Sequence, residues 1–99
     1  VHISRINHII ETDEPLPELI VSEPSKEDEA LGQYVSDLVE NEATIQLGIG
    51  TIPNAILKFL QDKKDLGVHS EMLSDGILDL IECGAISNDA KSVLPGKVA

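Results

Sequence analysis

The chain has 99 residues, which is at most one domain, and 41% of them are apolar, as in ordinary globular proteins. Its 18 acidic residues outnumber 7 lysines and arginines, which gives a formal net charge of -11. This charge argues against a nucleic-acid surface and an anionic membrane, because both attract clustered cations. No stretch reaches the ~18 apolar residues of a membrane span. Cys83 is alone, so no intrachain disulfide can form, and a reducing, cytoplasmic location is expected.

The first 24 residues predict an edge strand followed by an extended connection. Residues 1–10 alternate loosely between apolar and polar side chains, as an edge strand does. Residues 11–24 contain three prolines among acidic residues, which favours an extended, polyproline-like backbone. We therefore expect residues 1–24 to form a linker or strap. Because the chain opens with Val1 rather than Met, and residues 97–99 look like the start of another strand, we expect both ends to be cuts through a longer protein.

A helix is predicted immediately after this connection. Ser25 is a favourable N-cap, and Asp28 three positions later approximates a capping box. The helix is expected to end near Asn41. Apolar residues recur along it at helical spacing and predict one buried face. This face consists of Ala30, Leu31, Tyr34, Val35, Leu38 and Val39.

Two buried strands and two further helices are predicted in the remainder of the chain. Residues 43–47 and 66–71 are apolar and short enough to be buried strands. Residues 53–63 predict a helix between them, and a unit of about 30 residues has the usual length of a βαβ crossover. The fold class is therefore α/β with parallel strands. A third helix is predicted to be capped by Ser74 or Asp75. Its apolar face consists of Ile77, Leu78, Leu80 and Ile81.

Two segments that could carry chemistry follow the predicted strands. Gly48, Ile49 and Gly50 lie after the first strand, and Glu71 ends the second. Because the carboxyl ends of parallel strands share one edge of a sheet, where ligands bind, both segments should face one crevice. Glycines allow the backbone to approach a ligand closely, and amides at the start of the next helix favour a phosphate or a developing oxyanion. The glycine turn is thus a candidate substrate-binding segment, and Glu71 is a candidate catalytic carboxylate.

Structural explanations compete with each of these assignments. The glycine turn can be a tight strand-to-helix connection, since Pro53 replaces the third glycine of a dinucleotide fingerprint. Glu71 can be a surface glutamate just past the strand, and Asp75 is simply explained as a helix cap. The scattered histidines and the cysteine lack the spacing of a zinc site, so no metal is expected. A Ser-His-Asp triad is disfavoured because the adjacent strand residues His69 and Ser70 point to opposite faces.

Two longer segments resemble the signatures of the acetyl-CoA hydrolase/transferase family, which includes 4-hydroxybutyrate and butyrate:acetate CoA-transferases. The first is residues 45–55, IQLGIGTIPNA, and the second is residues 65–76, DLGVHSEMLSDG. Residues 1–4 and 13–18 resemble the family's interdomain connection, so the resemblance covers essentially the whole chain. It implies an internal fragment, with an interdomain linker or strap over the first 24 residues and the N-terminal part of the second CoA-transferase domain in residues 25–99.

In this family a glutamate in the His-Ser-Glu-Met segment is the nucleophile, and the resemblance implies that role for Glu71. The implied reaction is a ping-pong acyl-CoA:carboxylate CoA transfer through a glutamyl-CoA thioester, on short-chain acyl groups such as acetyl, butyryl or 4-hydroxybutyryl. Coenzyme A is then a substrate, with no permanently bound cofactor. The implied partners are an acyl-CoA, a short-chain carboxylate, the remainder of a longer chain and further copies of the protein. The fragment alone is expected to be inactive.

Three alternatives stay open at this point. One is an acetyl-CoA hydrolase of the same family, in which water intercepts the intermediate. Another is a non-catalytic α/β nucleotide-binding piece that uses residues 48–50 for phosphate and needs no covalent chemistry at Glu71. The last is a small interaction module whose acidic residues between Glu11 and Glu29 bind a basic partner in a salt-sensitive way.

Overall fold

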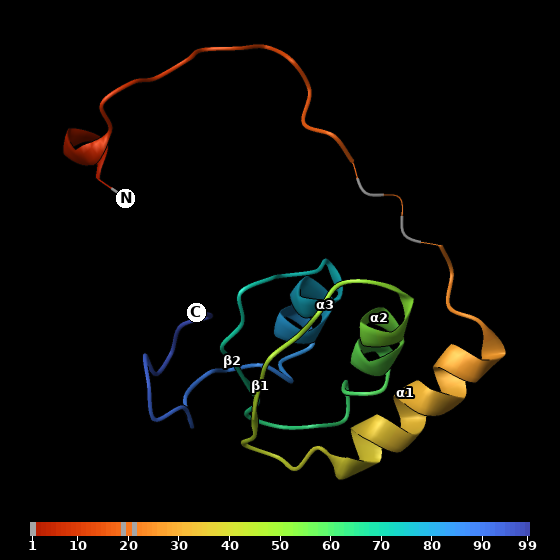
Figure 1. Cartoon of the computed structure of the whole chain (residues 1–99). Coiled ribbons are helices and arrows are strands. Elements are labelled where there is room, and N and C mark those ends of the chain that lie inside the picture. Colours follow the sequence, from red (N-terminus) through yellow and green to blue (C-terminus); the bar gives the residue numbers. More distant parts are fainter. Residues whose placement is uncertain (1, 19, 21) are drawn as a thin grey trace.

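The computed structural model describes residues 2–18, 20 and 22–99 (Figure 1). In chain order the elements are the 3-10 helix η1 (Ile3–Arg5), α1 (Lys26–Leu38), β1 (Thr44–Ile45), α2 (Thr51–Lys58), β2 (Gly67–Val68) and α3 (Gly76–Glu82). β1 and β2 pair in parallel with Thr44 opposite Gly67, and α2 connects them. The predicted α/β class and crossover are therefore confirmed. No helix in these described residues is long and apolar enough to cross a membrane.

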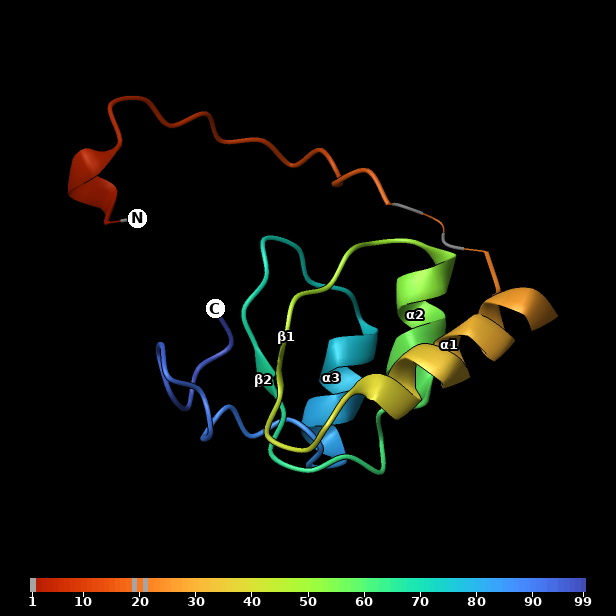
Figure 2. The ribbon, with the colours of Figure 1, turned by 60° about the horizontal axis from the view of Figure 1, so that its bottom comes forward.

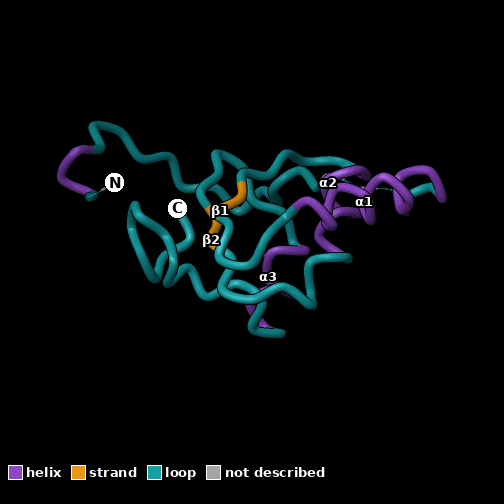
Figure 3. Tube along the Cα trace, turned by 90° about the horizontal axis from the view of Figure 1, so that it is seen from below, coloured by secondary structure: helices purple, strands orange, loops and turns teal. Residues whose placement is uncertain are grey.

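The two strands lie side by side and are shorter than expected (Figure 3). The sequence predicted strands over residues 43–47 and 66–71. The pairing extends slightly beyond the assigned strands, because the His69 amide donates to the Ile45 carbonyl at 3.0 Å. After that point the Ser70 hydroxyl bonds to the backbone of Leu47. The regular ladder ends early because a side chain replaces the next backbone partner.

The other edge of β2 is covered by the C-terminal segment (Figure 2). Leu66 forms an isolated parallel bridge with Ile86. The Ala99 amide donates to the Val68 carbonyl at 3.2 Å, and the Ser70 amide donates to the Ala99 carbonyl at 2.6 Å. The strand-like character predicted for the last three residues is visible in these bonds, although no regular strand is assigned there. The backbone of β2 is consequently held on both sides.

The hydrophobic core lies between the strand pair and helices α2 and α3 (Figure 2). Its buried side chains are Leu47, Leu57, Leu60, Leu66, Val68, Ile77, Leu80, Ala85 and Ile86. Full burial of one such leucine contributes about 1.5–3 kcal/mol, so this cluster holds the crossover together. The face predicted for α3 is only partly right. Ile77 and Leu80 are buried, whereas Leu78 and Ile81 are exposed.

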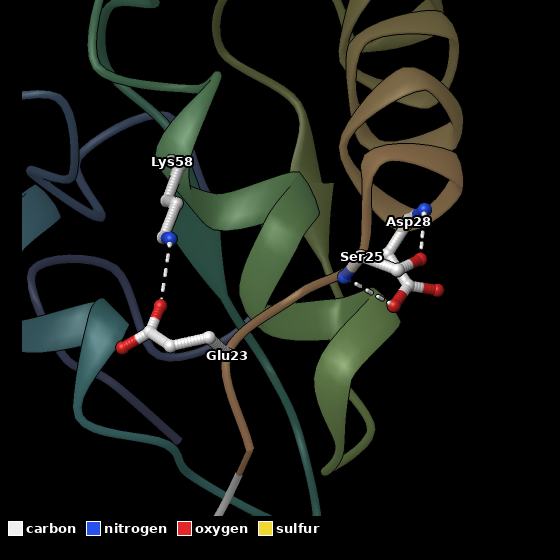
Figure 4. Close-up of polar contacts among 4 residues, drawn as sticks. All are labelled: Glu23, Ser25, Asp28 and Lys58. Carbon is white, nitrogen blue, oxygen red and sulfur yellow. Dashed lines mark hydrogen bonds and ion pairs between the residues drawn. The ribbon is translucent and has the colours of Figure 1, made fainter.

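Helix α1 begins as predicted. The Asp28 amide donates to Ser25 Oγ at 3.1 Å, and the Ser25 amide donates to Asp28 Oδ2 at 3.0 Å, which completes a capping box (Figure 4). The helix ends at Leu38, short of the expected end. Just before the start of α1, Glu23 forms an ion pair with Lys58 of α2 at 3.7 Å (Figure 4). Both side chains face solvent, so this pair adds little stability.

The face that α1 buries is not the predicted apolar face. Gly32 and Ser36 are the buried residues of the helix. Three large members of the predicted face are exposed, namely Leu31, Tyr34 and Leu38. A Cβ atom at Gly32 would lie only 2.9 Å from the backbone carbonyl carbon of Ala55, so α1 and α2 approach too closely for a larger residue. The prediction is wrong because small residues, which hydrophobic spacing ignores, set this contact.

The predicted edge strand at the start of the chain is also wrong. Residues Ile3–Arg5 form the 3-10 helix η1 instead, with the His2 ring accepting a bond from the Ser4 amide. The remaining described residues as far as Glu18 have no regular structure and are exposed, and Val1 lies outside the described residues. Loose alternation alone does not make a strand, because a strand needs a neighbour to satisfy its backbone.

The ends of the other two helices differ from the prediction as well. Helix α2 spans Thr51–Lys58 rather than residues 53–63. Pro53 occupies its third position, where a missing amide costs nothing because no intrahelical acceptor is available. Asp75 precedes α3, but its backbone is already helical (φ -59°, ψ -33°) and its side chain makes no capping bond. An N-cap needs an extended backbone to aim its side chain at the first amides, so the Asp75 side chain does not cap α3. Ser74, the other predicted cap, does not cap it either, because its Oγ has no hydrogen-bond partner in the described structure.

Candidate active site

The loops that follow β1 and β2 lie next to each other, at the shared carboxyl edge. Ser70 Oγ accepts from the Leu47 amide at 3.2 Å and donates to the Leu47 carbonyl at 2.9 Å. Leu47 immediately precedes the glycine turn, and Ser70 immediately precedes Glu71. Parallel pairing therefore brings together two segments that are more than twenty positions apart, as the βαβ prediction required.

The glycine turn has an unusual backbone and free amides. Gly50 has φ 124° and ψ -174°, a conformation that residues with a side chain rarely adopt. Within the part of the chain that the structure describes, the amides of Gly48, Ile49 and Gly50 donate to no protein acceptor. Gly48 and Ile49 are exposed, and the turn leads directly into α2, whose N-terminus carries positive partial charge. The turn can therefore bind an anionic group or a developing oxyanion.

Glu71 lies in the loop three residues after the end of β2 and is exposed. The strand that was predicted to end at Glu71 stops earlier, because the chain turns at Ser70. The Glu71 carboxylate forms no hydrogen bond or ion pair with any residue that the structure describes. Those same described residues contain no group of three or more metal-binding side chains. The carboxylate is thus available to a substrate.

A cavity of about 380 Å³ separates the glycine turn from the loop that follows Glu71. It is lined by Ile49, Gly50, Asn54, Leu73, Ser74, Asp75 and Gly76. Glu71 is not among these lining residues. Asn54 Oδ1 and Ser74 Oγ are buried without a hydrogen-bond partner in the described structure. Sequence reasoning missed both residues as site candidates, because a polar residue on a helix or in a loop carries no distinguishing signal by itself.

A buried lysine supports the strand that leads to Glu71. Lys91 is only 5% exposed, and its Nζ donates to the Val68 carbonyl at 2.7 Å and to the Lys97 carbonyl at 2.6 Å. Asn88 Oδ1 accepts from the Val68 amide at 2.9 Å. A Cβ atom on Gly67 would overlap the Lys91 stem, so the glycine makes room for the lysine. Nothing in the sequence pattern predicts this support, since Val68, which both Lys91 and Asn88 bond, lies twenty or more residues away from them.

Replacing Lys91 by methionine is expected to lower the free energy of unfolding by about 2–3 kcal/mol, since it removes charged hydrogen bonds to two carbonyls and keeps the stem volume. Urea unfolding of the monomeric chain measures this loss. Lys64→Met, at an exposed lysine, is the matched control and should change the free energy by less than ~0.5 kcal/mol. Equal effects of the two substitutions would show that the buried ammonium does not support β2.

Similarity to known proteins extends over nearly the whole chain, although no protein-family model matches it. The sequence is 46% identical over 98 residues to the 4-hydroxybutyrate coenzyme A transferase of Clostridium kluyveri, which covers 99% of this chain and 23% of that protein. It is 50% identical over 97 residues to the succinyl-CoA:cyclohexane-1-carboxylate CoA transferase of Geobacter metallireducens, which covers 98% of this chain and 22% of that protein.

A solved structure and a more distant relative complete the comparison. The structure of a 4-hydroxybutyrate CoA-transferase from Porphyromonas gingivalis matches with a TM-score of 0.82 and 42% identity, over 99% of this chain and 25% of that chain. The acetyl-CoA hydrolase of Kluyveromyces lactis is 47% identical over 51 residues, which is 50% of this chain and 10% of that protein. Transferases thus match the whole chain, whereas this hydrolase matches half of it.

The fold and the site define part of an α/β domain in which the loop that carries Glu71 is hydrogen-bonded to the residue before a glycine turn. The chain spans about a quarter of the length of the curated CoA-transferases that it matches. Because sequence identity to these relatives extends over the whole length of this chain, the chain belongs to the CoA-transferase family that they represent. It corresponds to one segment of such a protein.

Proposed function

We propose that the intact protein carrying this sequence is an acyl-CoA:carboxylate CoA-transferase for short-chain acyl groups, with Glu71 as its nucleophile. One observation carries the proposal. Among the residues that the structure describes, the Glu71 carboxylate has no partner, and it lies one residue from Ser70, which is hydrogen-bonded to Leu47 directly before a turn whose three amides donate to none of those residues. The identity to CoA-transferases supports the same reaction. Acetyl, butyryl and 4-hydroxybutyryl groups are the proposed acyl groups.

The two parts of the site would act on the same thioester carbonyl. The Glu71 carboxylate attacks that carbon, and the amides of Gly48, Ile49 and Gly50 stabilise the oxyanion that forms. The C–S bond breaks, which leaves an acyl-glutamyl anhydride and CoA thiolate. The thiolate then attacks the glutamyl carbonyl, releasing the first carboxylate and forming a glutamyl-CoA thioester. An acceptor carboxylate reverses these steps and leaves as the new acyl-CoA.

Other features of the proposed enzyme follow from this chemistry. Coenzyme A is a substrate, and the reaction requires no permanently bound cofactor or metal. The glycine turn contacts the acyl-CoA, and the remainder of the longer chain supplies the rest of the cleft. We further propose that the intact protein is a cytoplasmic homo-oligomer that binds neither nucleic acid nor a membrane.

Initial-rate kinetics of the intact protein tests this function. Acyl-CoA and acetate are varied together, and a ping-pong transferase gives parallel lines in a double-reciprocal plot. Lines that intersect would contradict a covalent intermediate. The alternative is an acetyl-CoA hydrolase, which the match to the Kluyveromyces lactis enzyme supports. A hydrolase releases free CoA at its full rate without an acceptor, whereas a transferase releases new acyl-CoA only when the acceptor is present.

The 99-residue chain by itself is expected to self-associate. Tyr34 is 72% exposed and Leu38 is 82% exposed on the outer face of α1. A second cavity, of about 350 Å³, is lined mainly by apolar residues of α3 and its neighbours, namely Leu73, Ser74, Asp75, Ile77, Leu78, Ile81 and Val98. Apolar surface of this kind favours association in water. Sedimentation velocity should show a concentration-dependent increase in mass that Tyr34→Glu with Leu38→Glu reduces, and a monomer at every concentration would contradict the expectation.

A further inference from the structure

Ser70 joins the two loops of the proposed site through a single side chain. Its Oγ donates to the Leu47 carbonyl at 2.9 Å, and it accepts from the Leu47 amide at 3.2 Å and from the Met72 amide at 3.3 Å. A hydroxyl has one proton to donate and two lone pairs to accept with. These three bonds use all of its capacity, so Ser70 is committed to holding backbone and has no bond left for a substrate.

The bonds of Ser70 fix the chain on both sides of Glu71. The bond from the Met72 amide back to Ser70 Oγ spans Glu71 and closes a tight turn around it. The Ser70 amide is itself held by the Ala99 carbonyl at 2.6 Å. The two bonds between the Ser70 hydroxyl and the Leu47 backbone form a clamp, and Leu47 is 9% exposed and anchored in the core directly before the glycine turn. The Ser70 hydroxyl therefore ties the backbone on both sides of Glu71 to the residue that precedes the glycine turn.

We propose that Ser70 is a positioning residue for CoA transfer, which holds the Glu71 carboxylate at a fixed distance from the free amides of the glycine turn. The inference rests on the proposed function, in which both groups act on one thioester carbonyl. Misplacement of a reacting group by about 1 Å can cost ~10²-fold in rate. A hydroxyl at this position is thus required for the speed of the covalent step rather than for binding of the acyl-CoA.

The test uses three variants of the intact protein. Ser70→Ala removes the clamp, and Ser70→Thr keeps the hydroxyl. Ser87→Ala is the matched control, because the Ser87 hydroxyl likewise donates and accepts hydrogen bonds, donating to Asp65 Oδ1 at 3.1 Å and accepting from the Asp89 amide at 3.2 Å. Single-turnover experiments with acyl-CoA measure the rate at which CoA is loaded onto Glu71. Steady-state assays give kcat and KM, and thermal unfolding reports the fraction of folded protein.

Ser70→Ala is expected to slow CoA loading ~10²-fold while KM for acyl-CoA changes less than about twofold. Ser70→Thr should load within about fivefold of the wild-type rate, and Ser87→Ala should load at the wild-type rate. A folded Ser70→Ala enzyme that loads CoA at the wild-type rate overturns the inference. If Ser70→Ala does not fold, a folded Ser70→Thr enzyme that loads CoA ~10²-fold more slowly than the wild type overturns the inference. A wild-type enzyme with no CoA on Glu71 contradicts the proposed function instead, so the two failures are distinguishable.

Discussion

Replacing Glu71 by alanine is expected to lower kcat for CoA transfer more than about 10³-fold in the intact protein, as loss of a covalent nucleophile does. The carboxylate must accept an acyl group and then CoA, and an alanine side chain can do neither. Glu71→Gln keeps the size of the side chain but gives an amide that does not attack a thioester, so it should be equally inactive. Steady-state assays of CoA transfer to acetate measure both variants.

Two further substitutions make the Glu71 experiment specific. Glu71→Asp keeps the carboxylate but shortens its reach, so it should cost ~10²-fold through misplacement of the attacking oxygen. Glu82→Ala changes an exposed glutamate at the end of α3 and should leave kcat unaltered. Normal ping-pong turnover by the Glu71→Ala enzyme would end the proposal that Glu71 is the nucleophile.

Replacing Gly32 by leucine is expected to lower the free energy of unfolding by about 3 kcal/mol, a large share of the stability of a small domain. The first carbon of the new side chain would lie 2.9 Å from the Ala55 carbonyl carbon, which is backbone and cannot rotate away. Helix α1 must then move off α2. The better helix propensity of leucine offsets only about 0.8 kcal/mol of this loss.

Gln33→Leu is the control for that substitution. It places the same side chain one position further along α1, at an exposed residue whose side-chain amide bonds Ser36 Oγ at 3.3 Å and Asp37 Oδ1 at 3.0 Å. Loss of these two bonds should lower the free energy of unfolding by only about 1 kcal/mol. Urea unfolding at concentrations where the chain is monomeric compares the two variants. Equal stability of Gly32→Leu and Gln33→Leu would mean that the close approach of α1 to α2 does not stabilise the fold.

Features set by neighbouring residues, or by the length of a connection, were predictable from the sequence. The Ser25 capping box is local, and both of its bonds form. The parallel pairing of β1 and β2 follows from the length of the crossover between them. That pairing also places the loop that carries Glu71 next to the glycine turn, as the shared carboxyl edge predicts. The unusual backbone of Gly50 agrees with the same reasoning.

Features that depend on individual side-chain contacts between distant residues were not predictable. The buried face of α1 is set by the distance to Ala55, which hydrophobic spacing does not encode. Lys91 is buried because carbonyls from two separate segments surround its ammonium group. The clamp formed by Ser70 requires knowing that Leu47 lies opposite it. A capping role for Asp75 failed for a related reason, because the preceding loop already bends its backbone into the helical region.

The most direct test of the account identifies the residue that carries CoA during turnover. The intact protein is incubated with acyl-CoA and no acceptor, and hydroxylamine then attacks any glutamyl thioester, expelling CoA thiolate and leaving a hydroxamate. Peptide mass spectrometry locates the modified residue. The account predicts a hydroxamate at Glu71 alone, and none at Glu71 when acyl-CoA is omitted. A modification mapped to another residue, or no modification in an enzyme that transfers CoA, would contradict it.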